Sequence, residues 1–312
     1  MAGAVDSEIA AWLAAYPAPD IDYRDVDAVR RLASGYMAEH GGPGPRWSRD
    51  DVHMESVVVG GVEAIMWRPR GSDDRLPVVL AFHGGAFILG GPLGAERVAV
   101  PLAAHHRIAT VSIAYPLAPE HRAPAARDAA RRALAALADL PGVDAGRVAV
   151  HGSSAGACLA AGLALHARDA GVRIALQSLS CPALDSRAAH ARDPDHSMLG
   201  LSPTLTRESV MAMWEHYLGE VPASDPRLRY VVPALADDLS GVAPAHITLA
   251  EHDVLRDEGL AYAQRLVDAA VSVEVDLVPG AVHGFEGLLP DSRIGRRAIE
   301  GQVSAIARAL GD

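Results

Sequence analysis

Short apolar runs alternate with Ala- and Leu-rich stretches along most of the chain. The runs cover residues 77–82, 108–114, 148–150, 174–179, 246–250 and 273–278, and helix-like stretches at 124–140, 155–170 and 257–270 separate most of them. Continuous apolar strands that alternate with helices are typical of a mainly parallel sheet with helices on both faces. The sequence therefore predicts an α/β fold whose functional loops follow the carboxyl ends of the strands.

The segments around this core differ from it in pattern. Residues 5–16 and 26–40 are predicted to form two short helices, and a stretch rich in Gly and Pro ends the second. Two strands around the Gly60-Gly61 turn are expected to form a hairpin. The interval between the fourth and fifth apolar runs contains helical stretches but no core strand. We therefore expect N-terminal cap helices at 1–45 and a cap insertion at 186–243. The α/β core is expected to comprise 46–185 and 244–312.

Composition excludes several kinds of chemistry. The chain has no lysine and no asparagine, which excludes a lysine-dependent phosphate loop, a Schiff-base lysine and a Cys-His-Asn triad. Its net charge of −11 argues against nucleic acid or an anionic membrane surface as the main partner. No metal-ligand spacing such as His-Glu-x-x-His occurs, so we expect neither a metal nor another cofactor.

The location expected from the sequence is the cytoplasm. The N-terminus carries Asp6 and Glu8 and no early basic residue, unlike a signal peptide. No apolar run reaches the ~18 residues that a transmembrane helix needs, so we expect no stable membrane insertion. Two cysteines, Cys158 and Cys181, are too few for a disulfide framework.

A Gly-x-Ser-x-Gly motif follows the third apolar run. Gly152-Ser153-Ser154-Ala155-Gly156 lies between this strand and a predicted helix, which is the context of a nucleophile elbow. A tight turn there lifts one serine above the sheet edge, and small flanking residues let the backbone pass close to neighbouring strands. We assign Ser154 as the nucleophile, with Ser153 as the adjacent alternative. An ordinary strand-to-helix turn would also explain the motif taken alone.

A second loop, His-Gly-Gly-Ala-Phe at 83–87, follows the first apolar run. Its glycines let consecutive backbone N–H groups converge on one point. We expect oxyanion donors from Gly85 and Ala86, with Gly84 as an alternative, joined by the N–H of Ala155. Ala86 donates as well as a glycine does if its φ is negative. The histidine of this loop suits holding the loop better than acting as a base.

A serine nucleophile needs a base and an orienting carboxylate. The fifth apolar run leads to Asp253 and the sixth to His283, so we assign Asp253 as the acid and His283 as the base. Asp257 and Glu258 are expected to cap the next helix, where acidic residues suit the positive end. Asp185 is a competing acid. The remaining histidines are expected at the surface.

Taken together, these motifs resemble the hormone-sensitive lipase family of α/β-hydrolase esterases. The resemblance covers most of residues 55–310 and includes a segment at 115–121 that is similar to the family's Tyr-Arg-Leu-Ala-Pro-Glu stretch. It implies an α/β-hydrolase fold with a helical cap, hydrolysis of carboxylic esters with short acyl chains, no cofactor and, in many relatives, a homodimer. The chain departs from the family pattern at five positions: Ala86 replaces the third glycine of the His-Gly-Gly-Gly loop, Ser153 replaces an acidic residue, Ala157 and Cys158 replace Gly-Asn, and Pro116 replaces Arg.

The sequence thus favours a serine carboxylesterase that uses Ser154, His283 and Asp253 on a small-molecule ester and passes through an acyl-enzyme. A ligand-binding protein on the same scaffold is the alternative, although relatives of that kind have lost the histidine that this chain keeps. A hydrolase of a lactone, amide or carbonate is a third hypothesis, because these reactions share the triad chemistry. Four apolar residues of the cap insertion suit either an acyl pocket or the cap core: Met211, Met213, Trp214 and Tyr217.

Overall fold

The structure is a computed structural model of the chain. It describes residues 4–16, 21–40, 50–72, 74–187, 202–219, 221–222 and 224–311, and of residues 36–40 the backbone only. Parts of the predicted cap helices and of the cap insertion, including residues 188–201, therefore lie outside the described residues.

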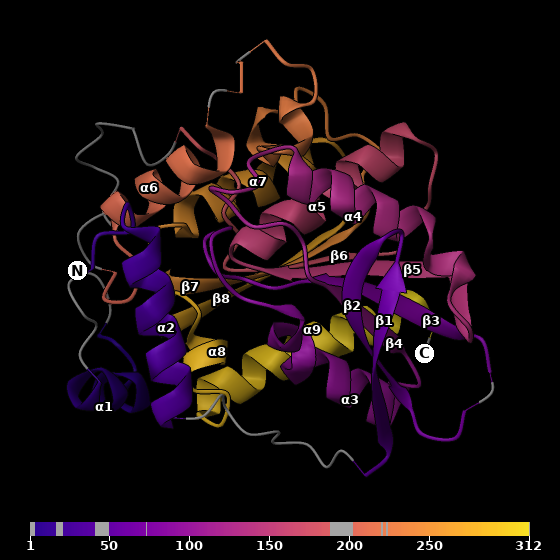
Figure 1. The fold of residues 1–312 in the computed structure, drawn as a ribbon, viewed down its shortest axis with the longest axis horizontal. Coiled ribbons are helices and arrows are strands. Elements are labelled where there is room, and N and C mark those ends of the chain that lie inside the picture. The colour runs from indigo at the N-terminus through magenta and orange to yellow at the C-terminus, as the bar shows by residue number, and fades with distance from the viewer. Residues whose placement is uncertain are drawn as a thin grey trace.

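Eight strands form one sheet: β1 Val52–Val59, β2 Val62–Pro69, β3 Leu76–Phe82, β4 Ala109–Ile113, β5 Val143–Ser153, β6 Gln177–Ser180, β7 Ala245–His252 and β8 Val273–Val282. Their order across the sheet is β1-β2-β4-β3-β5-β6-β7-β8 (Figure 1). β1 and β2 form the expected antiparallel hairpin, and β2 is also antiparallel to β4. The other neighbours are parallel. The predicted α/β fold with a mainly parallel sheet is confirmed.

Helices cover both faces of the sheet. On one face lie α4 (Ala125–Ala135), α5 (Ala155–Asp169) and α7 (Arg256–Asp268), and on the other lie α3 (Glu96–His106) and α9 (Arg293–Leu310) (Figure 1). Successive residues of β3 alternate between two apolar clusters, one under each helical layer, which is why the whole strand is buried. None of the described helices combines the length and the apolar character that a membrane span requires.

Two helices of the structure are absent from the sequence-based prediction. α3 contains Pro101 in its interior, a residue that argues against a helix because it lacks an N–H donor. The second, α8 (Phe285–Leu288), has only four residues, which is too short for a helical period to show. In both cases packing against α9 supplies what the local sequence does not.

The two N-terminal helices pack on the core. Ile9 of α1 (Ser7–Ala15) lies in an apolar cluster with residues of α8 and α9. Arg30 of α2 (Val26–His40) forms an ion pair of 2.6 Å with Glu120, in the segment that follows β4. Both helices are thereby held near the loops that follow the core strands. The domain boundaries expected from the sequence stay a prediction.

Histidines in the core strands are buried, so the expectation of surface positions is wrong for them. His151 in β5 and His246 in β7 lie in one row across the sheet, with Ser178 of β6 between them. They are 6% and 2% exposed, and His252 at the end of β7 is 3% exposed. Burial lowers the pKa of His246 and lowers that of His151 to about 4. These histidines lie in stretches of inner strands that helices cover on both faces, where even polar side chains are buried.

Candidate active site

Ser154 lies in the tight turn between β5 and α5. Its φ of 54° and ψ of −118° form a strained conformation that residues with a side chain rarely adopt. A Cβ on Gly152 would lie 2.2 Å from the carbonyl oxygen of Gly156, and a Cβ on Gly156 would lie 2.2 Å from that of Phe82. Since only glycine fits at either position, the two glycines allow the turn that presents the serine.

The structure brings Ser154, His283 and Asp253 into one chain of hydrogen bonds. Nε2 of His283 is 3.0 Å from Oγ of Ser154, and Nδ1 of His283 is 2.7 Å from Oδ2 of Asp253. The three residues follow β5, β7 and β8, whose carboxyl ends lie at the same edge of the parallel sheet. The adjacent Ser153 is the last residue of β5, and the contact with the histidine is made by Ser154.

The surroundings of His283 favour its protonated form. Asp253 is 1% exposed, and its Oδ1 accepts the backbone N–H of Leu255 at 3.0 Å. Burial lowers the pKa of His283, but the charge and hydrogen bond of Asp253, with the charge of Glu286, outweigh burial and raise that pKa above its usual value. The imidazole therefore retains a transferred proton more readily than a free histidine does.

The competing acids are engaged elsewhere. Asp185 and Asp257 each form an ion pair with a nearby arginine, at 2.8 and 2.7 Å. Glu258 lies in the first turn of α7, as expected, but it is buried and accepts backbone N–H groups from the loop after β6. Burial raises the pKa of Glu258 well above its usual value. Asp253 is thus the acid that the structure places on His283.

The loop after β3 lies against the serine. A Cβ on Gly84 would be 3.2 Å from the carbonyl oxygen of Ser153 and 3.6 Å from Cβ of Ser154. Two later N–H groups of the loop donate to the carbonyl oxygen of Gly85 at 3.0 Å, and this turn carries φ values of 119° at Gly85 and 52° at Ala86. The condition of a negative φ at Ala86 is therefore not met. Gly84, the alternative donor, lies against the serine turn.

His83 holds this loop from within the core. Its Nδ1 donates to the carbonyl oxygen of Gly84 at 2.7 Å, because a carbonyl can only accept. Its ring stacks on Tyr115 with centroids 4.1 Å apart, and the Tyr115 hydroxyl donates to the His83 carbonyl oxygen at 2.8 Å. Burial lowers the pKa of His83 to about 4, so the ring is neutral at pH 7. Tyr115 opens the 115–121 segment, which thereby supports the loop.

Aromatic side chains connect the same loop to α6 (Arg207–Leu218) of the predicted cap insertion. The ring of Phe87 stacks on that of Tyr217 with centroids 3.7 Å apart. The centroid of the Trp214 ring is 5.7 Å from that of Phe87. Met213, Trp214 and Tyr217 are each at most 2% exposed. The cap-core interpretation therefore holds for these three residues.

Three residues beside His283 were missed by sequence reasoning. Glu286 lies three positions after His283, is 4% exposed and accepts a short hydrogen bond from the Ser180 hydroxyl. Its second oxygen has no hydrogen-bond partner among the described residues. Cys181 follows β6 directly, and its Sγ lies within 4.8 Å of ligand atoms of His283 and Asp253. The position of Ser180 and Cys181 at the carboxyl end of a core strand was the signal available for them.

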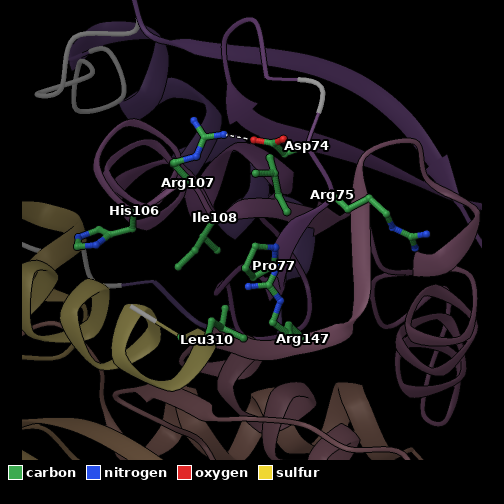
Figure 2. Close-up of a pocket in the computed structure, with 10 residues that line it drawn as sticks. Asp74, Arg75, Pro77, His106, Arg107, Ile108, Arg147 and Leu310 are labelled. Carbon is green, nitrogen blue, oxygen red and sulfur yellow. Dashed lines mark hydrogen bonds and ion pairs between the residues drawn. The ribbon is translucent and has the colours of Figure 1, made fainter.

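A cavity of about 400 Å³ lies at the opposite edge of the sheet (Figure 2). Leu76 and Pro77 at the start of β3 line it, together with Arg107, whose guanidinium pairs with Asp74. Ligands of parallel sheets bind beyond the carboxyl ends of the strands. This cavity is at the amino-terminal end of β3 and is therefore separate from the site around Ser154.

Comparisons of the sequence identify ester hydrolases. A family described as alpha/beta hydrolase fold matches residues 79–287, a range that includes all three members of the hydrogen-bond chain. The carboxylesterase NlhH of Mycobacterium tuberculosis is 37% identical over 242 residues, which are 76% of this chain and 75% of the relative. The ethyl acetate hydrolase of Pseudomonas putida is 34% identical over 229 residues, 70% of each chain.

The solved structures lead to the same group. A bacterial heroin esterase superimposes with a TM-score of 0.88 at 32% sequence identity, over 99% of this chain and 98% of that one. Because the match spans the sheet, the covering helices and the loops described above, it concerns the whole fold. The chain belongs to the α/β-hydrolase family of carboxylic ester hydrolases, in the group related to hormone-sensitive lipase.

Proposed function

We propose that Ser154, His283 and Asp253 are the catalytic triad of this ester hydrolase, and that its substrates are small carboxylic esters with short to medium acyl chains. The observation that carries the proposal is the hydrogen-bond chain between the three side chains, with distances of 3.0 and 2.7 Å. A serine hydroxyl is a weak nucleophile, and an adjacent base held by a carboxylate is what activates it.

The reaction follows from these positions. His283 Nε2 takes the proton of Ser154 as Oγ attacks the ester carbonyl carbon, while the Asp253 carboxylate accepts the hydrogen bond from Nδ1–H and stabilises the imidazolium. The imidazolium then protonates the leaving alcohol, and an acyl-enzyme remains. Water gives a proton to His283 and attacks the acyl carbon, and Ser154 recovers its proton as the acid leaves.

The oxyanion of each tetrahedral intermediate is proposed to be bound by the N–H groups of Gly84, Gly85, Ala86 and Ala155. Ala155 is the first residue of α5, where helix N–H groups are free to donate and the helix dipole is positive. The contact between Gly84 and the serine turn supports the loop's part in this set. Ala86 stays in the set, because its positive φ is a rotation about its N–Cα bond and leaves the N–H group able to donate. Each such donor contributes about 10²–10³ to kcat in comparable enzymes.

A small acyl group is supported by the packing of aromatic rings at the oxyanion loop. Phe87 is 1% exposed and stacks on Tyr217, so these rings fill space next to the oxyanion loop. The similarity to an ethyl acetate hydrolase points the same way. A small-molecule ester is therefore the proposed partner, and the cytoplasmic location and the homodimer stay proposals from the sequence.

The test is hydrolysis of p-nitrophenyl esters from acetate to palmitate by the wild type, Ser154→Ala and the matched control Ser153→Ala. Rates should peak at short chains, fall by at least about 10³-fold in Ser154→Ala and persist in the control. A Ser154→Ala protein with wild-type turnover would overturn the triad. If the wild type cleaves no ester, labelling of Ser154 by a fluorophosphonate would favour a lactone, amide or carbonate, and absence of labelling would favour the ligand-binding alternative.

A further inference from the structure

Three chemically different metal-ligand atoms meet beside the serine. Sγ of Cys181, a carboxylate oxygen of Asp253 and a ring nitrogen of His283 all lie within 4.8 Å of one another. We propose that Cys181, Asp253 and His283 bind a thiophilic divalent cation, Zn²⁺ or Cd²⁺, and that the bound ion switches ester hydrolysis off. The inhibitory half of this proposal rests on the proposed triad, whereas the binding half does not.

The donor set selects the class of ion. One sulfur, one nitrogen and one oxygen ligand suit zinc and cadmium, whereas alkaline-earth ions prefer sites made of oxygen alone. Bond lengths of about 2.0–2.3 Å place the ligand atoms of a tetrahedral zinc site about 3.3–3.7 Å apart. His283 and Asp253 are 2.7 Å apart and Cys181 lies within 4.8 Å. Side-chain shifts of about 1 Å therefore complete the site, and a water molecule takes the fourth position.

The charge at this point favours a cation. The negative charges of Asp253 and Glu286 both act on the Cys181 thiol, while the cation Arg97 acts on Glu286. Glu286 is 4% exposed and one of its oxygens has no hydrogen-bond partner among the residues described. Cys181 and Asp253 are buried, but 13% of the His283 side chain is exposed, and this edge is where an ion enters.

Binding removes the base from the reaction. The ion forms bonds to Sγ of Cys181, Oδ2 of Asp253 and Nδ1 of His283, so the thiol releases its proton to solvent. The Nδ1 proton also leaves, and Nε2 takes up one proton in its place, which makes a net release of one proton per ion. His283 then donates from Nε2 to Ser154 Oγ instead of accepting its proton. The serine is no longer activated, although the substrate site is unchanged.

The experiment is a titration of the full chain with CdCl₂, read in two ways. The thiolate-to-cadmium absorption band reports binding, and the rate of p-nitrophenyl acetate hydrolysis, normalised to each protein's metal-free rate, reports inhibition. The variants are Cys181→Ala, the more conservative Cys181→Ser, and the matched control Cys158→Ser. Cys158 is also buried, but its Sγ donates to the backbone oxygen of Val231 at 3.1 Å.

The wild type and the control should show one band per chain and inhibition that EDTA reverses. Both Cys181 variants should lose the band and need at least about tenfold more Cd²⁺, since loss of even an outer partner of a metal site costs that much. Equal sensitivity in wild type and Cys181 variants, or no band in the wild type, overturns the proposal. A band without inhibition overturns the inhibitory half alone. Failure of the triad is recognised separately, by an active Ser154→Ala protein.

Discussion

Replacing Asp253 with asparagine should inactivate the enzyme without unfolding it, because a neighbouring hydrogen bond decides how the new amide is oriented. Oδ1 of Asp253 accepts the backbone N–H of Leu255 at 3.0 Å. Only the oxygen of an asparagine amide can keep that bond. The amide NH₂ group must therefore face Nδ1 of His283, which is 2.7 Å from Oδ2 in the native protein.

The size of the expected loss in kcat follows from the ring proton of His283, which this amide orientation moves from Nδ1 to Nε2. An NH₂ group donates, so Nδ1 of His283 has to accept, and the ring proton must move to Nε2. Nε2 then faces Ser154 with a proton already on it and cannot take another. In serine triads this change of tautomer lowers kcat about 10⁴-fold, which corresponds to about 5 kcal/mol in activation free energy.

The assay is steady-state hydrolysis of p-nitrophenyl acetate, with thermal unfolding of the same samples. We expect kcat to fall and KM to change little, because Asp253 is 1% exposed and lies behind His283. Asp257→Asn is the control: it makes the same charge change four residues away, at an acid paired with Arg256. An Asp253→Asn protein within about tenfold of wild-type kcat/KM would refute the tautomer argument.

Three further predictions concern pH and packing. Glu286→Gln removes a charge that raises the pKa of His283, so the acid limb of the kcat/KM–pH profile should move to lower pH; an unmoved limb contradicts this. His151 has a pKa of about 4 in the folded protein and about 6.5 when unfolded, so the unfolded chain binds more protons between these values. The free energy of unfolding should therefore fall as pH drops from about 6.5 to 4, by up to about 3 kcal/mol. Urea titrations of wild type and His151→Gln across this pH range measure how much of the loss is due to His151. Gly156→Ala places a Cβ 2.2 Å from a backbone oxygen at the end of β3 and should destabilise by about 3 kcal/mol, whereas Gly35→Ala, in α2 with nothing within 4 Å, should stabilise by up to about 1 kcal/mol in thermal unfolding.

The fold and the hydrogen-bonded residues could be predicted because both follow from local signals. Each parallel strand is a continuous apolar run in the sequence. Because the strands are parallel, the residues that follow them lie together at the carboxyl-terminal edge of the sheet, where ligands bind. Ser154 is identified by its Gly-x-Ser-x-Gly motif after such a run, and Asp253 and His283 by their order after the two later runs. The structure then brings them within hydrogen-bond distance without any long-range signal in the sequence.

The features that escaped prediction depend on contacts between distant segments. Ser180 and Glu286 are 106 positions apart in the sequence. They meet because β6 and β8, the strands that precede them, lie on either side of β7 in the sheet. The positive φ of Ala86 arises from the turn that later residues of its loop close on Gly85. His151 is polar and was expected at the surface, yet it is buried because helices cover both faces of its strand. Periodicity reports which segments are strands, but not what packs on each side.

The asparagine substitution and the metal ion act on the same atom, which makes their combination informative. Both remove the acceptor that holds the proton on Nδ1 of His283, and both leave that proton on Nε2. Two perturbations of one step are not additive. Saturating Cd²⁺ should therefore inhibit the wild type strongly and reduce the residual activity of Asp253→Asn little further, even where the thiolate band of Cys181 shows that the ion is bound. Losses that multiply would mean that the ion acts elsewhere, by blocking the substrate or the serine itself, and the tautomer explanation of inhibition would fail.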